Sequence, residues 1–142
     1  MVKLDKFVLH TKKYNEFINI TEKVEEMAGR CGITNGVVYI ITAHTTAGIT
    51  VNEALECLQS DMSGLMDRLV PEDAPYAHAR MLHSYGTTAG NPTGHLKSML
   101  TGNHAVFLLN NKKLVRGGVQ DIFFCEYDGA QSRTVYMAVI GE

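Results

Sequence analysis

One uninterrupted apolar run constrains the fold of this 142-residue chain more than any other segment. Residues 36–43 read GVVYIITA, which is a β-branched stretch of strand length. Because the run shows no alternation of polar and apolar residues, it predicts a central strand that is buried on both faces. Residues 48–52 do alternate, and they predict a second strand directly after it.

Three other segments carry apolar residues at helical spacing. Residues 20–31 predict a helix that Asn19 or Thr21 can cap and that Gly29 or Gly32 can end. The apolar residues between 55 and 69 predict a second helix. Residues 93–100, preceded by Asn91 and Pro92 and followed by Gly102, predict a short third one.

The remaining strands are expected at residues 4–11, 105–109, 121–126 and 133–140. Asp128 and Gly129 lie between the last two, in a pattern typical of a hairpin. Strands that are joined by turns more often than by helical crossovers favour a largely antiparallel sheet. We therefore expect one compact α+β domain over residues 1–142, with a largely antiparallel sheet packed with about three helices.

The composition restricts the classes of partner. A formal net charge of -2 gives no global attraction for nucleic acid or for an anionic membrane. The sequence contains neither a signal-peptide pattern nor 18 consecutive apolar residues, so we expect a cytosolic protein without a membrane partner. Cys31, Cys57 and Cys125 are widely spaced in apolar surroundings, which favours buried, reduced thiols over ligands or nucleophiles.

Three histidines lie where the periodic patterns stop, and they suggest a metal centre. His44 follows the central strand, His83 lies in a long segment without sustained periodicity, and His95 begins the short helix. Neutral imidazole is a common ligand for zinc, but the spacing of these three matches no compact zinc motif, so structural histidines are the alternative. His78 shares a proline-bounded turn with Tyr76 and has no second signal beside it.

Three charged residues are candidates for catalysis. Lys97 lies near the start of the short helix, where backbone N–H groups favour an anion such as phosphate. Glu53 follows Asn52 at a strand-to-helix junction, and it is either a general base or a partner of a liganding imidazole, or it simply stabilises the helix start. Arg133 can bind a phosphate or carboxylate through two hydrogen bonds, with a surface ion pair as the alternative.

Three blocks of this sequence, in this order and spacing, resemble the YjbQ-like family. The blocks are residues 44–53 (HTTAGITVNE), His83 together with residues 94–102 (GHLKSMLTG), and residues 118–129 (GVQDIFFCEYDG). The match spans almost the whole chain, and its three blocks together are specific where any one alone is not.

The resemblance implies an α+β homotrimer whose site is built around His44, His83 and His95 and opens near a subunit boundary. It also implies a thiamine-phosphate synthase activity, in which a pyrimidine diphosphate is joined to a thiazole phosphate and pyrophosphate is released. We expect the three histidines to bind a divalent metal, zinc by preference. Lys97 and Arg133 would then offset the charge of a small phosphorylated substrate, and Glu53 would orient a ligand or move a proton.

Two other functions fit the same residues. A three-histidine metal site leaves an open position that can activate water, so a hydrolase of a small phosphorylated substrate is one alternative. A non-catalytic protein that binds a small anion is the other. The sequence also departs from the family pattern, because Val119 stands where the family usually has Trp, and Ala130-Gln131 stand where it often has Pro-Arg.

Overall fold

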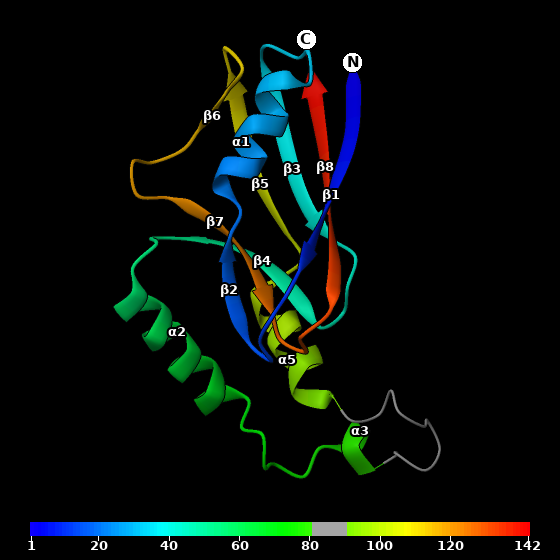
Figure 1. The fold of residues 1–142 in the computed structure, drawn as a ribbon, viewed down its shortest axis with the longest axis vertical. Coiled ribbons are helices and arrows are strands. Elements are labelled where there is room, and N and C mark those ends of the chain that lie inside the picture. The colour runs from blue at the N-terminus through cyan, green and yellow to red at the C-terminus, as the bar shows by residue number, and fades with distance from the viewer. Residues whose placement is uncertain (81–90) are drawn as a thin grey trace.

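Two antiparallel sheets form the frame of the protein in the computed structural model, which describes residues 1–80 and 91–142 (Figure 1). The five-stranded sheet has the order β1-β8-β3-β5-β6, and the three-stranded sheet has the order β2-β7-β4. The strands are β1 (Val2–His10), β2 (Glu16–Asn19), β3 (Gly36–Thr42), β4 (Ala47–Asn52), β5 (His104–Asn110), β6 (Lys113–Val115), β7 (Asp121–Glu126) and β8 (Ser132–Gly141). The helices are α1 (Thr21–Arg30), α2 (Glu56–Leu69), α3 (Ala77–Arg80) and α5 (Pro92–Thr101).

The main core lies between the inner face of the five-stranded sheet and a layer made by α1 and the three-stranded sheet. The alternation of buried and exposed side chains along β8 shows how one strand contributes to this core. In β8, Val135, Met137 and Val139 point inward and are buried, whereas Tyr136 and Ile140 on the opposite face of the strand are exposed. The predicted α+β architecture is therefore confirmed, with more strands than expected, because the short β2 and β6 gave no clear signal in the sequence.

Most of the predicted elements are present at nearly the predicted places. Residues 36–42 form the middle strand of the larger sheet, β3. The first helix ends just before Gly32, whose φ of 89° is a left-handed conformation that suits glycine, and α5 likewise ends before Gly102 at a φ of 88°. Within the described ranges, no helix is long and apolar enough to cross a membrane.

The prediction that β3 is buried on both faces is wrong for a single chain. Val38 and Ile40 are fully buried, but Val37, Tyr39 and Ile41 on the opposite face are only half-buried. No described element covers that side of the five-stranded sheet, and we call it the outer face. Its most exposed apolar residues are Val2, Leu4, Val8, Val106, Leu108, Val115, Tyr136 and Ile140.

The predicted hairpin around Asp128 and Gly129 is also wrong. β7 pairs with β2 and β4, whereas β8 pairs with β1 and β3, so the two strands belong to different sheets. The turn residues carry the chain from one sheet to the other. Turn composition predicts that the chain changes direction, but it does not say which strands pair afterwards.

Helix α2 lies at the periphery beside the three-stranded sheet, and none of its residues is buried (Figure 1). Met66 packs against a small cluster on that sheet, but Leu65 and Leu69 remain exposed. Cys57 on this helix is exposed too, so the prediction of buried thiols is wrong for Cys57. It is confirmed for Cys125, where burial raises the thiol pKa to about 12 and makes the side chain unreactive.

Candidate functional site

His44 and His95 line one open hollow of about 510 Å³, although they come from different parts of the chain. His44 lies in the connection between β3 and β4, and His95 lies in the first turn of α5. Gly94 lets α5 approach closely, because a Cβ there would be 2.8 Å from the carbonyl oxygen of Tyr127. We call this space the histidine hollow; its described lining also includes Thr42, Thr45, Ser98 and Met99.

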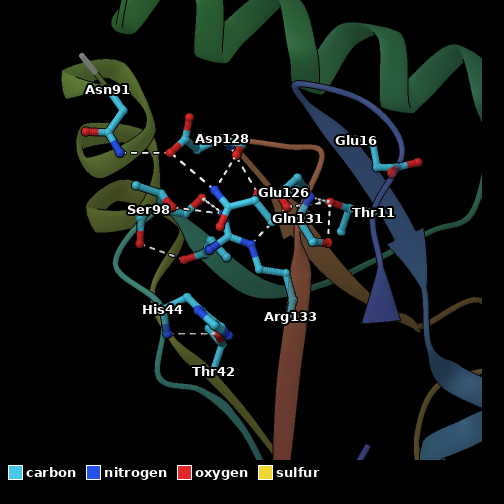
Figure 2. Close-up of polar contacts among 12 residues, drawn as sticks. Thr11, Glu16, Thr42, His44, Asn91, Ser98, Glu126, Asp128, Gln131 and Arg133 are labelled. Carbon is cyan, nitrogen blue, oxygen red and sulfur yellow. Dashed lines mark hydrogen bonds and ion pairs between the residues drawn. The ribbon is translucent and has the colours of Figure 1, made fainter. Parts of the chain in front are cut away.

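Backbone and side-chain contacts fix the ring of His44. Nε2 of the ring accepts a hydrogen bond from the backbone N–H of Thr134 at 3.1 Å. The backbone N–H of His44 donates to Oγ1 of Thr42 at 3.3 Å (Figure 2). Burial lowers the pKa of His44, and the positive charge of Arg133 lowers it further against the weaker opposite effect of Glu126. Both effects favour the neutral form of the ring, which is the form that binds metal ions.

A buried ion pair lies behind His44. Arg133 donates from Nε to Oε1 of Glu126 at 2.9 Å and from Nη2 to Oε2, and Nη2 also donates to Oγ1 of Thr46 at 2.9 Å (Figure 2). Thr11 donates a further hydrogen bond to Oε1 of Glu126 at 2.7 Å. Both charged groups are almost inaccessible to solvent, at 3% for Arg133 and 0% for Glu126. Arg133 therefore forms part of the wall behind the hollow.

Lys97 points away from the hollow as well. Its side chain is 2% exposed, and its Nζ donates to Oδ1 of Asp67 at 2.9 Å. Asp67 lies on α2 and is 65% exposed. Lys97 thus connects α5, which carries His95, to the peripheral helix, and its charge is already paired within the protein.

A third imidazole lies beside His95, and it was not among the predicted ligands. The ring of His78, on α3, is 5.2 Å from that of His95, centroid to centroid. Hydrogen bonds from Tyr14 and Thr93 to Glu72 anchor the segment that leads to α3. His78 gave no signal in the sequence because it lies outside any periodic pattern. The predicted ligand His83 lies outside the described residues.

Glu53 is not part of the histidine hollow in a single chain. It follows the last residue of β4, whereas His44 precedes the first one, so the strand separates them. Its neighbour Asn52 pairs with Asp121 at the start of β7, next to Gln120. Of the predicted site residues, the structure brings His44 and His95 to one hollow, places Arg133 behind it, and leaves Glu53 at the other end of β4.

The described residues do not by themselves form a metal site. In the described part of the chain, no three His, Cys, Asp or Glu side chains are close enough together to hold an ion. His44 and His95 offer imidazoles of a suitable kind, but Nε2 of His44 is already a hydrogen-bond acceptor. In the neutral ring the proton is then on Nδ1. Coordination by His44 therefore requires its ring to exchange the Thr134 contact for the ion.

Comparisons with known proteins agree with one another. The family model "UPF0047 protein YjbQ-like" matches residues 5–142. UPF0047 protein YugU of Bacillus subtilis is 38% identical over 133 residues, which cover 94% of this chain and 96% of that protein. A UPF0047 protein of Methanocaldococcus jannaschii is 30% identical over 140 residues, covering 98% of this chain and 95% of that protein.

Solved structures show the same fold. A YbjQ-like protein of unknown function from Sulfolobus solfataricus superposes with a TM-score of 0.89 at 30% identity, covering 100% of this chain and 99% of that one. An uncharacterized protein of the YjbQ/UPF0047 family from Clostridium acetobutylicum gives a TM-score of 0.85 at 31% identity, covering 96% of this chain and 99% of that one. The resemblance seen in the three sequence blocks thus extends over the whole domain.

Proposed function

This chain belongs to the YjbQ/UPF0047 family, and on that basis we propose that it is a metal-dependent enzyme acting on a small phosphorylated substrate. The observation that carries the proposal is the placement of His44 and His95, from two distant elements, on one open hollow of about 510 Å³. A hollow of that volume admits a small molecule. Solvent-accessible imidazoles in such a place are more useful as ligands or proton carriers than as packing groups.

The proposed cofactor is a divalent ion, zinc by preference, held by His44, His95 and a third imidazole. His83 is the third ligand that the sequence predicts, and His78 is the one that lies beside His95. A bound zinc ion supplies a Lewis acid that stabilises negative charge on a phosphate oxygen. Burial and the nearby Arg133 favour the neutral form of His44 that this role needs.

The protein's own residues have supporting roles in this proposal. Arg133 and Lys97 were predicted to offset the charge of the substrate. Since both are buried and paired with Glu126 and Asp67, we assign them instead as positioning residues that hold the β3–β4 connection and α5 in place. Ser98 has a similar role, because its hydroxyl donates to the carbonyl of Ala47 at 2.6 Å and fastens α5 to β4.

Metal analysis of the purified protein tests the cofactor. We expect zinc in the wild type and a loss of most of it in His44→Ala and in His95→Ala. Comparing His78→Ala with His83→Ala identifies the third ligand, since only one of them should lose metal to the same extent. His10→Ala is the matched control, because this exposed histidine bonds only to Ser132 among the described residues. Unchanged metal in both His44→Ala and His95→Ala would contradict the proposal.

The reaction that the family resemblance suggests is the joining of a pyrimidine diphosphate to a thiazole phosphate with release of pyrophosphate. Incubation with both precursors should yield thiamine phosphate and pyrophosphate, and His95→Ala should abolish both products. Consumption of a single precursor without the other would instead identify a phosphohydrolase. Tight binding of a precursor without any turnover would identify a non-catalytic anion-binding protein and overturn the enzymatic proposal.

We also propose that the protein assembles as a homotrimer. The outer face of the five-stranded sheet supports this, because Leu4 is 78% exposed and Leu108 59% exposed on a face without a covering layer. Soluble monomers rarely leave apolar patches of such extent uncovered. Light scattering after size exclusion should give three times the 15.7 kDa chain mass. Leu108→Glu should lower that mass, whereas Lys23→Glu on the solvent side of α1 should not.

A further inference from the structure

A second hollow, of about 430 Å³, lies beside the edge strand β6, and its charge differs in sign from that of the whole chain. Its lining contains three cationic side chains and one carboxylate, which belong to Lys112, Lys113, Arg116 and Glu25. The whole chain carries a formal net charge of -2. A local excess of positive charge on such a protein favours an anionic ligand at that place. We call this space the lysine hollow.

The lysine hollow and the histidine hollow lie at opposite ends of the five-stranded sheet. Gly36 at the start of β3 pairs with Leu109, close to the turn between β5 and β6. His44 lies beyond the other end of β3. A strand advances about 3.3 Å per residue, so the seven residues of β3 span roughly 20 Å. Figure 1 shows the same separation, with the β5–β6 turn and α5 at opposite ends of the molecule. A small ligand in one hollow therefore does not reach the other.

The carboxylate in the lining of the lysine hollow is already paired. Nε of Arg116 donates to Oε1 of Glu25 at 2.8 Å, and Nη1 of Arg116 donates to the carbonyl of Gln120 at 2.6 Å. Because its charge is offset, Glu25 repels an anion less than a free carboxylate would. An adjoining hollow shares this ion pair but is also lined by Glu22 and Asp121. The side of the pair that favours an anion is therefore the side that carries the lysines.

The lysine hollow has hydrogen-bond donors to spare. Within the described part of the chain, the ammonium groups of Lys112 and Lys113 have no ion pair or hydrogen bond. Both residues are exposed, and their flexible stems can bring two charges onto one ligand. Among the same described residues, the backbone N–H of Gly118 has no partner, and a Cβ built there would meet nothing within 4 Å. This N–H is a further donor that an oxyanion can approach closely.

The turn that carries Lys112 is held in place by the protein itself. Asn111 and Lys112 have φ values of 50° and 63°, as in a two-residue hairpin turn. The backbone N–H of Asn111 donates to Oδ1 of Asn35 at 3.0 Å. That of Lys112 donates to the carbonyl of Thr34 at 2.8 Å. Glycine is preferred at the second position of such a turn, so a lysine there costs backbone free energy. A role of its side chain in binding would explain why this cost is tolerated.

We propose that the lysine hollow binds a small molecule that carries a diphosphate group. Two ammonium groups and a backbone N–H match the several oxygens and multiple negative charges of a diphosphate. A hollow of about 430 Å³ is within the range of small-molecule sites. This inference goes beyond the proposed function, because it uses no residue of the histidine hollow and needs no metal ion.

Titration with inorganic pyrophosphate, followed by the amide NMR signals of the protein, tests the site. At low salt, the signals of residues 112–118 should shift, and the shifts of Gly117 and Gly118 give the Kd. The double variant Lys112→Gln, Lys113→Gln should raise this Kd about tenfold. Added sodium chloride should weaken the binding to the wild type. His95→Ala should keep the wild-type Kd, which separates this test from that of the proposed reaction.

Lys12 and Lys13 supply the matched control. They are also consecutive and exposed, but they lie beside Glu16, which accepts hydrogen bonds from both of their backbone N–H groups. The double variant Lys12→Gln, Lys13→Gln removes the same total charge and should leave the Kd unchanged. An equal loss of affinity in this control would mean that pyrophosphate responds only to net charge, and it would overturn the proposal. Wild-type shifts that are absent from residues 112–118 would overturn it too.

Lys112→Gly separates binding from folding. Glycine suits a φ of 63°, so this variant should unfold at a temperature no lower than the wild type. Its Kd for pyrophosphate should nevertheless rise, because one ammonium group is lost. Lys112→Arg keeps the positive charge and should keep most of the affinity. Wild-type affinity in a folded Lys112→Gly protein would contradict the proposal, since the lysine would then have no part in binding.

Discussion

Glu126 and Arg133 belong to different sheets, yet their side chains form a two-point ion pair in the interior of the protein. The pair connects the end of β7 to the start of β8, and through Thr46 it also holds the chain that leads into β4. The same guanidinium lowers the pKa of His44. One buried contact therefore supports both the joining of the two sheets and the electrostatic state of the histidine hollow.

Removal of one partner of this pair should destabilise the protein strongly. Glu126→Ala leaves the buried charge of Arg133 without a counter-ion, and we expect a loss of about 3–5 kcal/mol in the free energy of unfolding. Urea denaturation measures the effect. Glu26→Ala, which breaks a surface pair with Arg30, is the control and should cost less than about 1 kcal/mol. The double variant Glu126→Leu, Arg133→Met should be more stable than Glu126→Ala; the opposite order would contradict this account.

The pair also predicts an acid-sensitive component of stability. Burial alone would raise the pKa of Glu126, but hydrogen bonds from Arg133, Thr11 and the backbone N–H of Asp128 outweigh it and hold the pKa below the ordinary value of 4.5. A depressed pKa stabilises the folded state above the unfolded-state value, and this contribution disappears as the pH falls through the folded-state value.

The stability difference between wild type and Glu126→Gln should therefore be constant near neutral pH and should shrink below the ordinary carboxyl range. Denaturation curves at a series of acidic pH values measure it. Glu26→Gln should show no comparable convergence, because that carboxylate is largely exposed. If this difference stays constant down to strongly acidic pH, the ionised carboxylate of Glu126 does not account for it, and the prediction is wrong.

The Lys97 and Asp67 pair should respond asymmetrically to substitution. Asp67→Ala leaves an ammonium group that is 2% exposed without its carboxylate, and we expect a loss of about 1–3 kcal/mol. Lys97→Met leaves only a carboxylate that is already 65% exposed, so its cost should be smaller. Thermal unfolding of both variants measures which one loses more stability. Amide exchange over residues 56–69 should increase in both, because each variant removes the ion pair that holds α2 to α5.

Two glycines in helices should behave in opposite ways when changed to alanine. At Gly94 a new Cβ would be 2.8 Å from the carbonyl oxygen of Tyr127, so Gly94→Ala must shift α5 and should cost about 1–3 kcal/mol. At Gly64 the nearest atom is the mobile end of Arg68 at 3.5 Å, and Gly64→Ala should stabilise α2 by about 0.5–1 kcal/mol. Because α5 carries His95, Gly94→Ala should also reduce metal content, whereas Gly64→Ala should leave it unchanged.

Local patterns predicted the elements of this fold better than their partners. The strand predicted from residues 36–43 and the helix ends predicted from Gly32 and Gly102 depend on near neighbours in sequence, and the structure confirms them. The burial of that strand on both faces depends on distant parts of the chain, and that prediction was wrong. The pairing of β8 with β1 and β3 depends on contacts across the whole chain, and a turn sequence at Asp128 holds no information about them. This is why the hairpin prediction was wrong although both strands were right.

The candidate site, like the fold, was only partly predictable from the sequence. His44 and His95 lie at the boundaries of strong periodic segments, which drew attention to them, and they do line one hollow. The proximity of His78 to His95 depends on how the segment before α3 is anchored through Glu72, and no spacing rule contains that. The roles predicted for Arg133 and Lys97 were not predictable in this way. The sequence shows that both residues are positively charged, but it does not show that each is buried and paired with a carboxylate of the same chain.

The length of β4 has a consequence for how substitutions at its two ends combine. Because His44 and Glu53 lie beyond opposite ends of a strand that spans roughly 17 Å, their side chains are too far apart to contact each other within one chain. Substitutions at sites this far apart usually have independent effects on stability. The losses in the free energy of unfolding from His44→Ala and from Glu53→Ala should therefore add in the double variant to within about 0.5 kcal/mol, so the two ends of the strand can be altered separately.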